Sequence, residues 1–364
     1  MKPLNLCLSI DYELFGSGRG DVFTHIIEPT NRMLAICCKN GIKLSIFFEI
    51  VEYWKLKENY ESGERMGYDK NPAEAMAKQI RKAHQMGHDV QLHLHPQWID
   101  AKYENGEWKL NMKYWRLPEV PDRANDEISM GLGELIRKAK EDLEAILKPV
   151  NPDYTCNVLR AGAYNIDPSE RLLKVLKENG FIADTSVYYG GKADNNLSRY
   201  DYTNIKNDVP YWFTNGSLLS ASNNHMEFLE LPVFAKQIRR IRKYDLIRVR
   251  SALKNKANSI EKFKNNSVKK SKWETFKYLL DKESITWDFC LFSKSKMRKF
   301  LKAAYQANKS SNVSFHPFVL VGHPKDFYYP DAIDYLARKA SAGKLKFFTI
   351  SEVISQIKKT HTQK

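Results

Sequence analysis

The stretch Asn71–His95, NPAEAMAKQIRKAHQMGHDVQLHLH, holds the unit from which the fold is built. Asn71 can cap a helix, Pro72 suits the first helical position, and Gly87 is typical of a helix end. The residues after Gly87 form a largely apolar run that closes with His93 and His95. A helix that leads directly into a buried strand predicts an α/β protein.

The same order of helix, glycine and strand recurs in 31–50, 167–187 and 331–350, where the helix stops are Gly41, Gly180 and Gly343. Strands that are apolar on both faces belong to a mainly parallel sheet covered by helices. About seven strands are expected, at 4–10, 42–48, 89–95, 157–164, 181–187, 228–233 and 313–321. This number suits a closed or nearly closed barrel, in which chemistry collects at the carboxyl ends of the strands.

The size and composition of the chain favour one folded domain. The sequence has 364 residues, of which 43% are hydrophobic and 12% aromatic, values that fit a globular protein with a sizeable core. We expect a single barrel domain over 1–364, with insertions at about 101–126 and 236–282. The first insertion has no clear period and resembles a long loop over the site, and the second contains helical patches from 236 to 257.

The formal net charge of +15 is concentrated in one segment. Between Lys236 and Trp273 there are fourteen Lys and Arg residues against Asp245 and Glu261. In the rest of the chain the basic and acidic residues are nearly equal in number, which argues against a protein that binds nucleic-acid phosphates over a whole face. The basic segment is either a solvated helical face or a surface for phosphates or for an anionic membrane.

The chain start and the cysteines indicate a cytoplasmic location. In the segment MKPLNLCLSIDYE the apolar run ends at Asp11, too early for a signal peptide. No later apolar run approaches membrane-spanning length. The five cysteines show no zinc-type spacing, so we expect reduced core thiols in a reducing compartment.

Two pairs of strand-end residues have the spacing of a site. Asp11 and Glu13 are two positions apart, and so are His93 and His95, so each pair shares one strand face. Two neutral imidazoles and a carboxylate can hold a catalytic metal with a position left for water. The structural alternatives are a carboxylate that pairs with an arginine and histidines that are packed in the core.

Two further strand ends carry polar residues. In RAGAY, 160–164, small residues separate Arg160 from Tyr164, so the backbone can approach a ligand and Arg160 can hold a carboxylate ionised. The alternative is an arginine that covers a loop and a tyrosine at the rim. His323 follows an apolar run and Gly322, where a histidine can serve as a general acid.

Taken in order, these pieces resemble the polysaccharide deacetylases of the NodB-homology type. The matching segments are SIDYE (9–13), GHDVQLHLHPQW (87–98), RAGAY (160–164), GFIADTSV (180–187) and VLVGHPK (319–325). The chain departs from the family pattern in two ligands. Glu13 stands for the usual aspartate, and Gln97 occupies the place of the second histidine, so that His95 must substitute.

The resemblance implies a distorted (β/α)7 barrel with a divalent metal, zinc, on Glu13, His93 and His95. It implies Asp11 as the base that takes a proton from water, with Arg160 keeping it charged, and His323 as the acid. The backbone N–H near Tyr164 would meet the oxyanion. We further expect Trp98 and Asp184, at two of the strand ends, to contact the substrate.

The predicted function is metal-dependent removal of an acetyl or other acyl group from an N-acetylated sugar. The substrate is expected to be a nucleotide- or lipid-linked precursor in surface polysaccharide or lipopolysaccharide synthesis, with no specific nucleic acid as partner. Peripheral contact of 236–273 with an anionic membrane is also predicted. The alternatives are a glycoside hydrolase that uses Asp11 and Glu13, and an inactive sugar-binding or nucleic-acid-binding protein.

Overall fold

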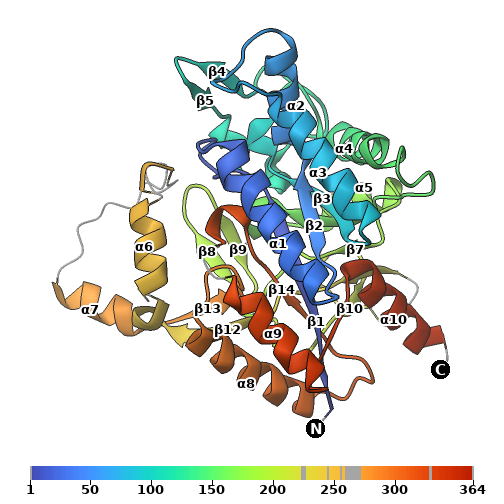
Figure 1. The fold of residues 1–364 in the computed structure, drawn as a ribbon, viewed down its shortest axis with the longest axis vertical. Helices are drawn as coiled ribbons and strands as arrows, with labels where there is room; N and C mark the ends of the chain where they lie inside the picture. Colours follow the sequence, from blue (N-terminus) through green and yellow to red (C-terminus); the bar gives the residue numbers. More distant parts are fainter. Residues whose placement is uncertain are drawn as a thin grey trace.

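The computed structural model describes residues 2–222, 227–243, 246–254, 256–258, 272–327 and 330–362 (Figure 1). The strands are β1 (Leu4–Tyr12), β2 (Ser45–Glu49), β3 (Asp89–Leu94), β4 (Lys102–Glu104), β5 (Glu107–Lys109), β6 (Val158–Ala161), β7 (Ala183–Asp184), β8 (Lys192–Asp194), β9 (Arg199–Asp201), β10 (Trp212–Thr214), β11 (Phe228–Glu230), β12 (Ala235–Arg239), β13 (Lys282–Thr286), β14 (Pro317–Leu320) and β15 (Leu345–Phe347). The helices are α1 (Glu28–Lys39), α2 (Ile50–Glu61), α3 (Pro72–Gln85), α4 (Leu132–Leu147), α5 (Glu170–Glu178), α6 (Leu246–Lys254), α7 (Lys272–Leu280), α8 (Lys294–Ser310), α9 (Asp331–Ser341) and α10 (Ile350–Thr362).

The main sheet is a ring of parallel strands. Its order is β10-β11-β7-β6-β3-β2-β1-β14, with β10 antiparallel to β11 and β15 paired to the start of β1. The ring is completed just after β11, where Val233 bridges Val319 of β14 and Phe234 donates its N–H to the Val319 carbonyl at 2.8 Å. Strands β1, β2, β3, β6, β7, β11 and β14 therefore form the distorted (β/α)7 barrel that the sequence predicts.

The local signals for helix ends are confirmed. Asn71 caps α3 by accepting the Glu74 N–H at 3.1 Å, and Pro72 is the first residue of that helix. Gly87, which follows α3, has φ of 83°, a left-handed conformation in which a residue with a Cβ is strained. The chain can therefore turn sharply from α3 into β3, which brings His93 to the far end of a buried strand.

The core lies on both sides of the barrel wall. Every residue of β2 is buried, as are the residues of β3 from Val90 onward. Helices α2, α3, α4 and α5 contact one another in chain order outside the sheet, and α9 contacts both α1 and α8 (Figure 1). Because helices cover the outside and side chains fill the inside, both faces of each strand are apolar, as the sequence pattern requires. Among the described residues, no helix combines the length and the apolar character that a membrane crossing requires.

The two predicted insertions have more structure than the sequence indicates. Residues 101–126 contain the hairpin of β4 and β5 and two short 3-10 helices. The start of the second insertion is a strand and not the predicted helix, because β12 pairs antiparallel with β13 from Ala235–Thr286 to Arg239–Lys282. Pairing with a strand distant in sequence overrides local helical propensity there. Within the insertion, residues 244–245, 255 and 259–271 lie outside the described residues.

Candidate active site

The candidate site lies at the carboxyl ends of the barrel strands. The strand register places Glu49, His93 and Arg160 side by side at the ends of β2, β3 and β6. A pocket of about 320 Å³ opens there, lined by Asp11, Glu13, Phe15, Gly16, His93, His95, Trp115, Ala163, Tyr164, Asn258, His323 and Lys325. The fold thus brings together strand-end residues that are up to 312 positions apart in sequence.

Glu13, His93 and His95 form a compact cluster. The Oε2 atom of Glu13 lies 3.2 Å from His93 Nε2 and 2.7 Å from His95 Nε2. All three side chains are buried, and their ligand atoms lie within 4.8 Å of one another. Two imidazoles and one carboxylate are the donor set of catalytic zinc sites, in which the remaining positions are open to water or substrate. The residues present therefore fit a divalent metal.

The outer nitrogen of each imidazole has a partner that orients the ring. His93 Nδ1 lies 2.8 Å from the carbonyl oxygen of Arg160, to which it can donate, so that Nε2 turns toward Glu13. His95 Nδ1 lies 2.9 Å from the side-chain amide of Gln97. Rotation of that amide would offer Oε1, which has no hydrogen-bond partner among the described residues, as the acceptor. Gln97 thus orients the ring of His95.

Gly162 allows the backbone after β6 to lie against His95. A Cβ atom at this position would be 2.5 Å from Cε1 and Nδ1 of the His95 ring. The sequence predicted that small residues here would permit a close approach of the backbone to a ligand. The structure shows that the close approach at Gly162 is to His95, which holds this ring in place.

Asp11 is held as a carboxylate by a buried arginine. Arg160 is fully buried and its Nη1 donates to Asp11 Oδ1 at 2.7 Å, while its Nε donates to the carbonyl of Thr185. The guanidinium also lies over the Phe47 ring, 4.0 Å from the ring centroid. Burial by itself would raise the pKa of Asp11, but the charges of Arg160, His93 and His323 together outweigh it and lower the pKa below its usual value. Asp11 therefore remains a proton acceptor in a dry environment.

Lys325 is part of the site although the sequence did not single it out. Its Nζ donates to Glu13 Oε1 at 2.7 Å and also to the carbonyl of Leu14. Burial opposes the ionisation of Glu13, but Lys325 and His95 lower its pKa well below the usual range. With Oε1 bound to this ammonium, Oε2 of Glu13 points toward the two histidines. Only the short 3-10 turn at Pro324–Asp326, which carries Lys325 back toward β1, brings this residue to the site.

His323 lies close to the two pocket carboxylates. Its Nε2 lies 3.6 Å from Asp11 Oδ2 and 3.8 Å from Glu13 Oε1, and its Nδ1 lies 3.9 Å from Asp288 Oδ2. These distances are longer than hydrogen bonds, so the ring can turn to meet a substrate atom. Asp288, which the sequence did not identify, stands behind the ring on the side away from the pocket carboxylates.

The rim of the pocket combines strained backbone with parts of both insertions. Ala163 and Tyr164 have φ of 49° and 62°, in the left-handed region that residues with a Cβ rarely adopt. Trp115, from the first insertion, contacts the His95 ring edge-on with 5.6 Å between centroids. Asn258, from the second insertion, accepts a hydrogen bond from Ser17 through its backbone carbonyl at 2.7 Å. The insertions therefore shape the entrance to the site.

Two residues that the sequence predicted as substrate contacts lie outside the pocket lining. Trp98 is 1% exposed and packs edge-on against Trp108 of β5, 5.1 Å between centroids. Asp184 is fully buried and accepts hydrogen bonds from the backbone and hydroxyl of Ser186, both at 2.8 Å. Trp98 thus packs in the wall around the pocket, and Asp184 is buried inside the barrel. Any contact with substrate remains a prediction for both residues.

Several buried carboxyl groups beside the site have raised pKa values. Burial raises the pKa of Asp184 to about 6, and burial and the neighbouring Asp184 raise that of Glu230 well above its usual range. Burial also raises the pKa of Glu52 to about 8, although its carboxylate accepts the Leu14 N–H at 3.0 Å. Asp11 and Glu13 differ from these groups because each contacts a basic side chain directly.

Comparisons with known proteins find similarity to solved structures at low sequence identity. No protein-family model and no curated protein matches the sequence. Solved structures that are similar include one described as a polysaccharide deacetylase from Mycobacterium smegmatis, at 12% identity and a TM-score of 0.45, covering 100% of this chain and 91% of that one.

A family 4 acetyl xylan esterase from Clostridium thermocellum, solved with a cobalt ion, has 11% identity and a TM-score of 0.33, covering 97% of this chain and 91% of that one. A 4-alpha-glucanotransferase from Thermococcus litoralis has 11% identity and a TM-score of 0.44; 98% of this chain is covered, but only 40% of the glucanotransferase. Because these values are low, we base the function on the side chains of the site itself.

Proposed function

We propose that the protein is a metal-dependent hydrolase that removes an acetyl or other acyl group from the nitrogen of an amino sugar. The observation that carries this proposal is the buried Glu13–His93–His95 cluster, with Asp11 and His323 beside it at 3.6 Å from each other. A metal ligand set, a charged base and an acid that face one pocket are the parts that amide hydrolysis needs.

Glu13, His93 and His95 would hold the divalent ion, and we propose zinc because a set of two nitrogens and one oxygen suits it. Such an ion supplies Lewis acidity, which polarises a carbonyl and makes a water more acidic. Lys325 holds the Glu13 carboxylate in place, and Gln97 and the Arg160 carbonyl hold the imidazoles. These contacts leave the three donor atoms with little freedom, which is what precise positioning of a substrate requires.

Asp11 would take the proton from the attacking water, since Arg160 keeps its carboxylate charged and fixed. A carbon–oxygen bond then forms at the acyl carbon while the carbon–nitrogen bond breaks. His323 would give its proton to the departing nitrogen, so that the products are a carboxylic acid and a free amine. The backbone N–H of Tyr164 is the proposed donor to the oxyanion, at a position where the backbone is held left-handed.

The glycoside hydrolase alternative is less consistent with the pocket. A glycosidase needs one carboxyl group that stays protonated and donates to the leaving oxygen. Asp11 contacts Arg160, and Glu13 contacts Lys325, so both pocket carboxyl groups are held in the charged form. The buried acids beside the site with raised pKa values, Asp184, Glu230, Glu52 and Glu49, do not line the pocket.

The test is acetate release from UDP-N-acetylglucosamine and from N-acetylglucosamine oligosaccharides, with and without a chelator. We expect activity that the chelator abolishes and zinc restores. Acetate release that persists after complete removal of metal would overturn the mechanism. Chelator-insensitive release of a reducing sugar would favour the glycosidase instead.

Metal content provides the second arm of this test. His93→Ala and Glu13→Ala should both lower the amount of zinc that the purified protein retains. The matched control is His84→Ala in α3, which removes a histidine that bonds Asn151 and lies outside the pocket. If zinc content is the same in all three variants, the ligand assignment is wrong.

A further inference from the structure

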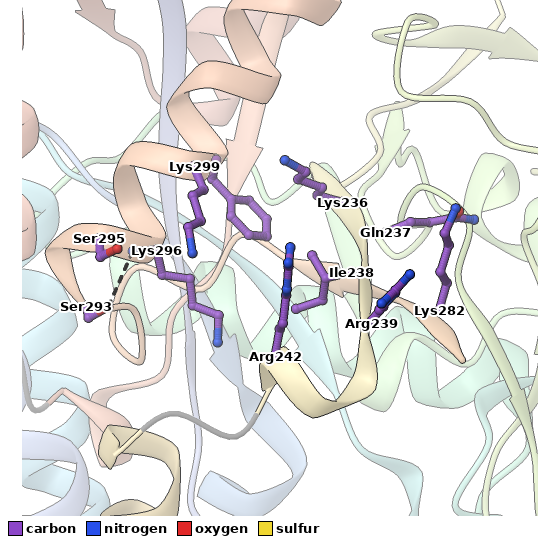
Figure 2. A pocket seen from close by; sticks show the side chains of 11 residues that line it. Lys236, Gln237, Ile238, Arg239, Arg242, Lys282, Ser293, Ser295, Lys296 and Lys299 are labelled. Atoms are coloured by element: carbon purple, nitrogen blue, oxygen red, sulfur yellow. Dashed lines mark hydrogen bonds between the residues drawn. The ribbon is translucent and has the colours of Figure 1, made fainter. Parts of the chain in front are cut away.

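A second pocket, of about 510 Å³, lies between α8 and the hairpin of β12 and β13 (Figure 2). Six cationic side chains line it: Lys236, Arg239, Arg242, Lys282, Lys296 and Lys299. None of the described residues that line it carries a carboxylate. In Figure 2, the ends of Lys296, Lys299 and Arg242 gather in the space between α8 and β12. The cavity is therefore strongly positive on several sides.

The acidic residues near this hairpin neutralise other cations. Glu283 lies 2.7 Å from Lys243 and 3.6 Å from Arg240, and Asp281 lies 3.6 Å from the same arginine. Arg240 and Lys243 belong to the turn after β12 but do not line the pocket. The carboxylates of the hairpin thus contact Arg240 and Lys243, which lie outside the pocket lining.

The beginning of α8 adds to the positive potential. Ser293 caps the helix by accepting the Lys296 N–H, and the first turn contains no acidic residue. Backbone N–H groups and the helix dipole favour an anion at this end, and they disfavour the lysines found there. Burial and the nearby charges of Lys299, Lys302 and Arg242 lower the pKa of Lys236, which shows that these cations repel one another. A bound anion would relieve that repulsion.

We propose that this pocket binds a phosphate or diphosphate group. Arg242 offers a planar pair of donors, and Lys236 and Lys299 offer point charges around the same space. Phe300 and Ile238 close part of the wall with apolar surface, which reduces screening by water. The cavity is large enough for a ligand of several heavy atoms beyond one phosphate.

The chain connects this pocket to the candidate active site. Asp288, beside His323, precedes Ser293 by five residues, so their Cα atoms are at most roughly 18 Å apart along an extended chain. The same insertion that supplies Arg242 also supplies Asn258 at the rim of the site. Assignment of the phosphate to the carrier of the sugar substrate rests on the proposed function; the phosphate site itself does not.

The first test is calorimetric titration of the full-length protein with inorganic pyrophosphate at about 150 mM salt. Lys299→Glu and Arg242→Ala each change an exposed residue, so the fold should persist, as thermal unfolding will verify. We expect each to weaken binding at least about tenfold, the loss expected for one charge-assisted hydrogen bond. The matched control is Lys309→Glu, which makes the same charge change in the last turn of α8 and should leave affinity unchanged.

The second test distinguishes a soluble phosphate from a lipid headgroup. Vesicles of phosphatidylcholine with phosphatidic acid are compared with vesicles that carry the same charge as oleate carboxylate. Binding of pyrophosphate or of phosphatidic acid vesicles that Lys299→Glu weakens at least about tenfold supports the proposal and identifies the source of the phosphate. Equal binding to oleate vesicles, tighter binding to single-stranded RNA than to pyrophosphate, or no binding of any phosphate probe would overturn it.

The two proposals fail separately. Pyrophosphate binding without acetate release would retain the phosphate site and overturn the hydrolase. Chelator-sensitive acetate release without binding of any phosphate probe would support the hydrolase proposal and contradict the phosphate site in the second pocket. If both hold, the Lys299→Glu variant should lose activity on a phosphate-linked sugar and keep activity on a sugar without phosphate.

Discussion

The two pockets of this protein use charge in opposite ways. In the candidate active site each charged group is buried and paired: Asp11 with Arg160, and Glu13 with Lys325. In the basic pocket the cations face one another, and Lys299 and Arg242 are exposed. Buried ions need partners because desolvation is expensive, whereas water and salt screen exposed like charges. The first site should therefore tolerate few substitutions, and the second should tolerate many.

The largest expected effect comes from Asp11→Asn. Acetate release should fall by about 10²–10⁴, the contribution of a general base. The protein should also lose about 3–5 kcal/mol of stability, because Arg160 is left fully buried beside an uncharged partner. Steady-state kinetics and denaturant unfolding measure the two losses. Activity within tenfold of the parent protein would remove Asp11 from the role of base.

Gly162→Ala should damage the metal cluster without touching a ligand. The new Cβ would be 2.5 Å from the His95 ring, so either the ring or the backbone must move. We expect zinc affinity to fall about 10–100-fold, as when a partner of a ligating histidine is lost. Gly133→Ala, where a Cβ meets nothing within 4 Å, is the control and should bind zinc normally. Equal zinc affinity in both variants would contradict the role of Gly162.

Glu52→Gln should stabilise the protein more as the pH rises. Below pH about 4.5 the Glu52 carboxyl is protonated in both the folded and the unfolded chain. Between pH 4.5 and about 8 it ionises only in the unfolded chain, because burial raises its folded pKa to about 8. The parent protein therefore loses stability across this range, on the order of 5 kcal/mol in all, and the variant does not.

Unfolding by urea at pH 5 and pH 9 measures this difference. The control is Glu58→Gln in the same helix α2, an exposed side chain that pairs with Lys55. It should show the same free energy of unfolding, relative to the parent, at both pH values. A constant difference for Glu52→Gln would mean that the carboxyl is charged in the folded protein.

Lys325→Met should make the protein depend more on metal. Without the ammonium, the Glu13 carboxylate keeps only its histidine partners, at a loss of about 1–3 kcal/mol in the metal-free protein. Added zinc should restore part of that loss, so the zinc-induced rise in Tm should exceed that of the parent protein. Thermal unfolding with and without zinc measures both. An equal rise would show that Lys325 does not compete with metal for the Glu13 charge.

The smallest effect is expected in the basic pocket. Lys299→Glu should change the free energy of unfolding by less than about 0.5 kcal/mol, as for most exposed positions. Zinc content should also stay the same. A large loss of stability or of metal would show that the basic pocket is part of the folded core, so that the two pockets would not differ in their tolerance of substitution.

Much of the barrel could be predicted from the sequence because its signals are local. Alternation of helix, glycine and strand depends on residues a few positions apart, and the four predicted helix stops all have positive φ. The exception is β12, where helical spacing predicted a helix. Its hydrogen bonds go to β13, more than 40 residues later, and no local sequence pattern identifies so distant a partner.

The candidate site could be predicted where residues stand at strand ends. Asp11, Glu13, His93, His95, Tyr164 and His323 all line one pocket. Lys325 could not be predicted, because a lysine after a histidine is common and only a turn directs it to Glu13. Trp98 follows a strand end but packs under the β4–β5 hairpin, since the chain turns just before it.

The sequence by itself determined the repeating units, the strand ends and the residue types that can bind a metal. Strand alternation and helix capping depend on residues a few positions apart, so they can be predicted from a short stretch of sequence. Only the tertiary structure decided which charges meet: Arg160 with Asp11, Lys325 with Glu13, and the lysines of α8 with Arg242. These contacts depend on ring closure and strand register, which bring together groups that no spacing along the chain relates.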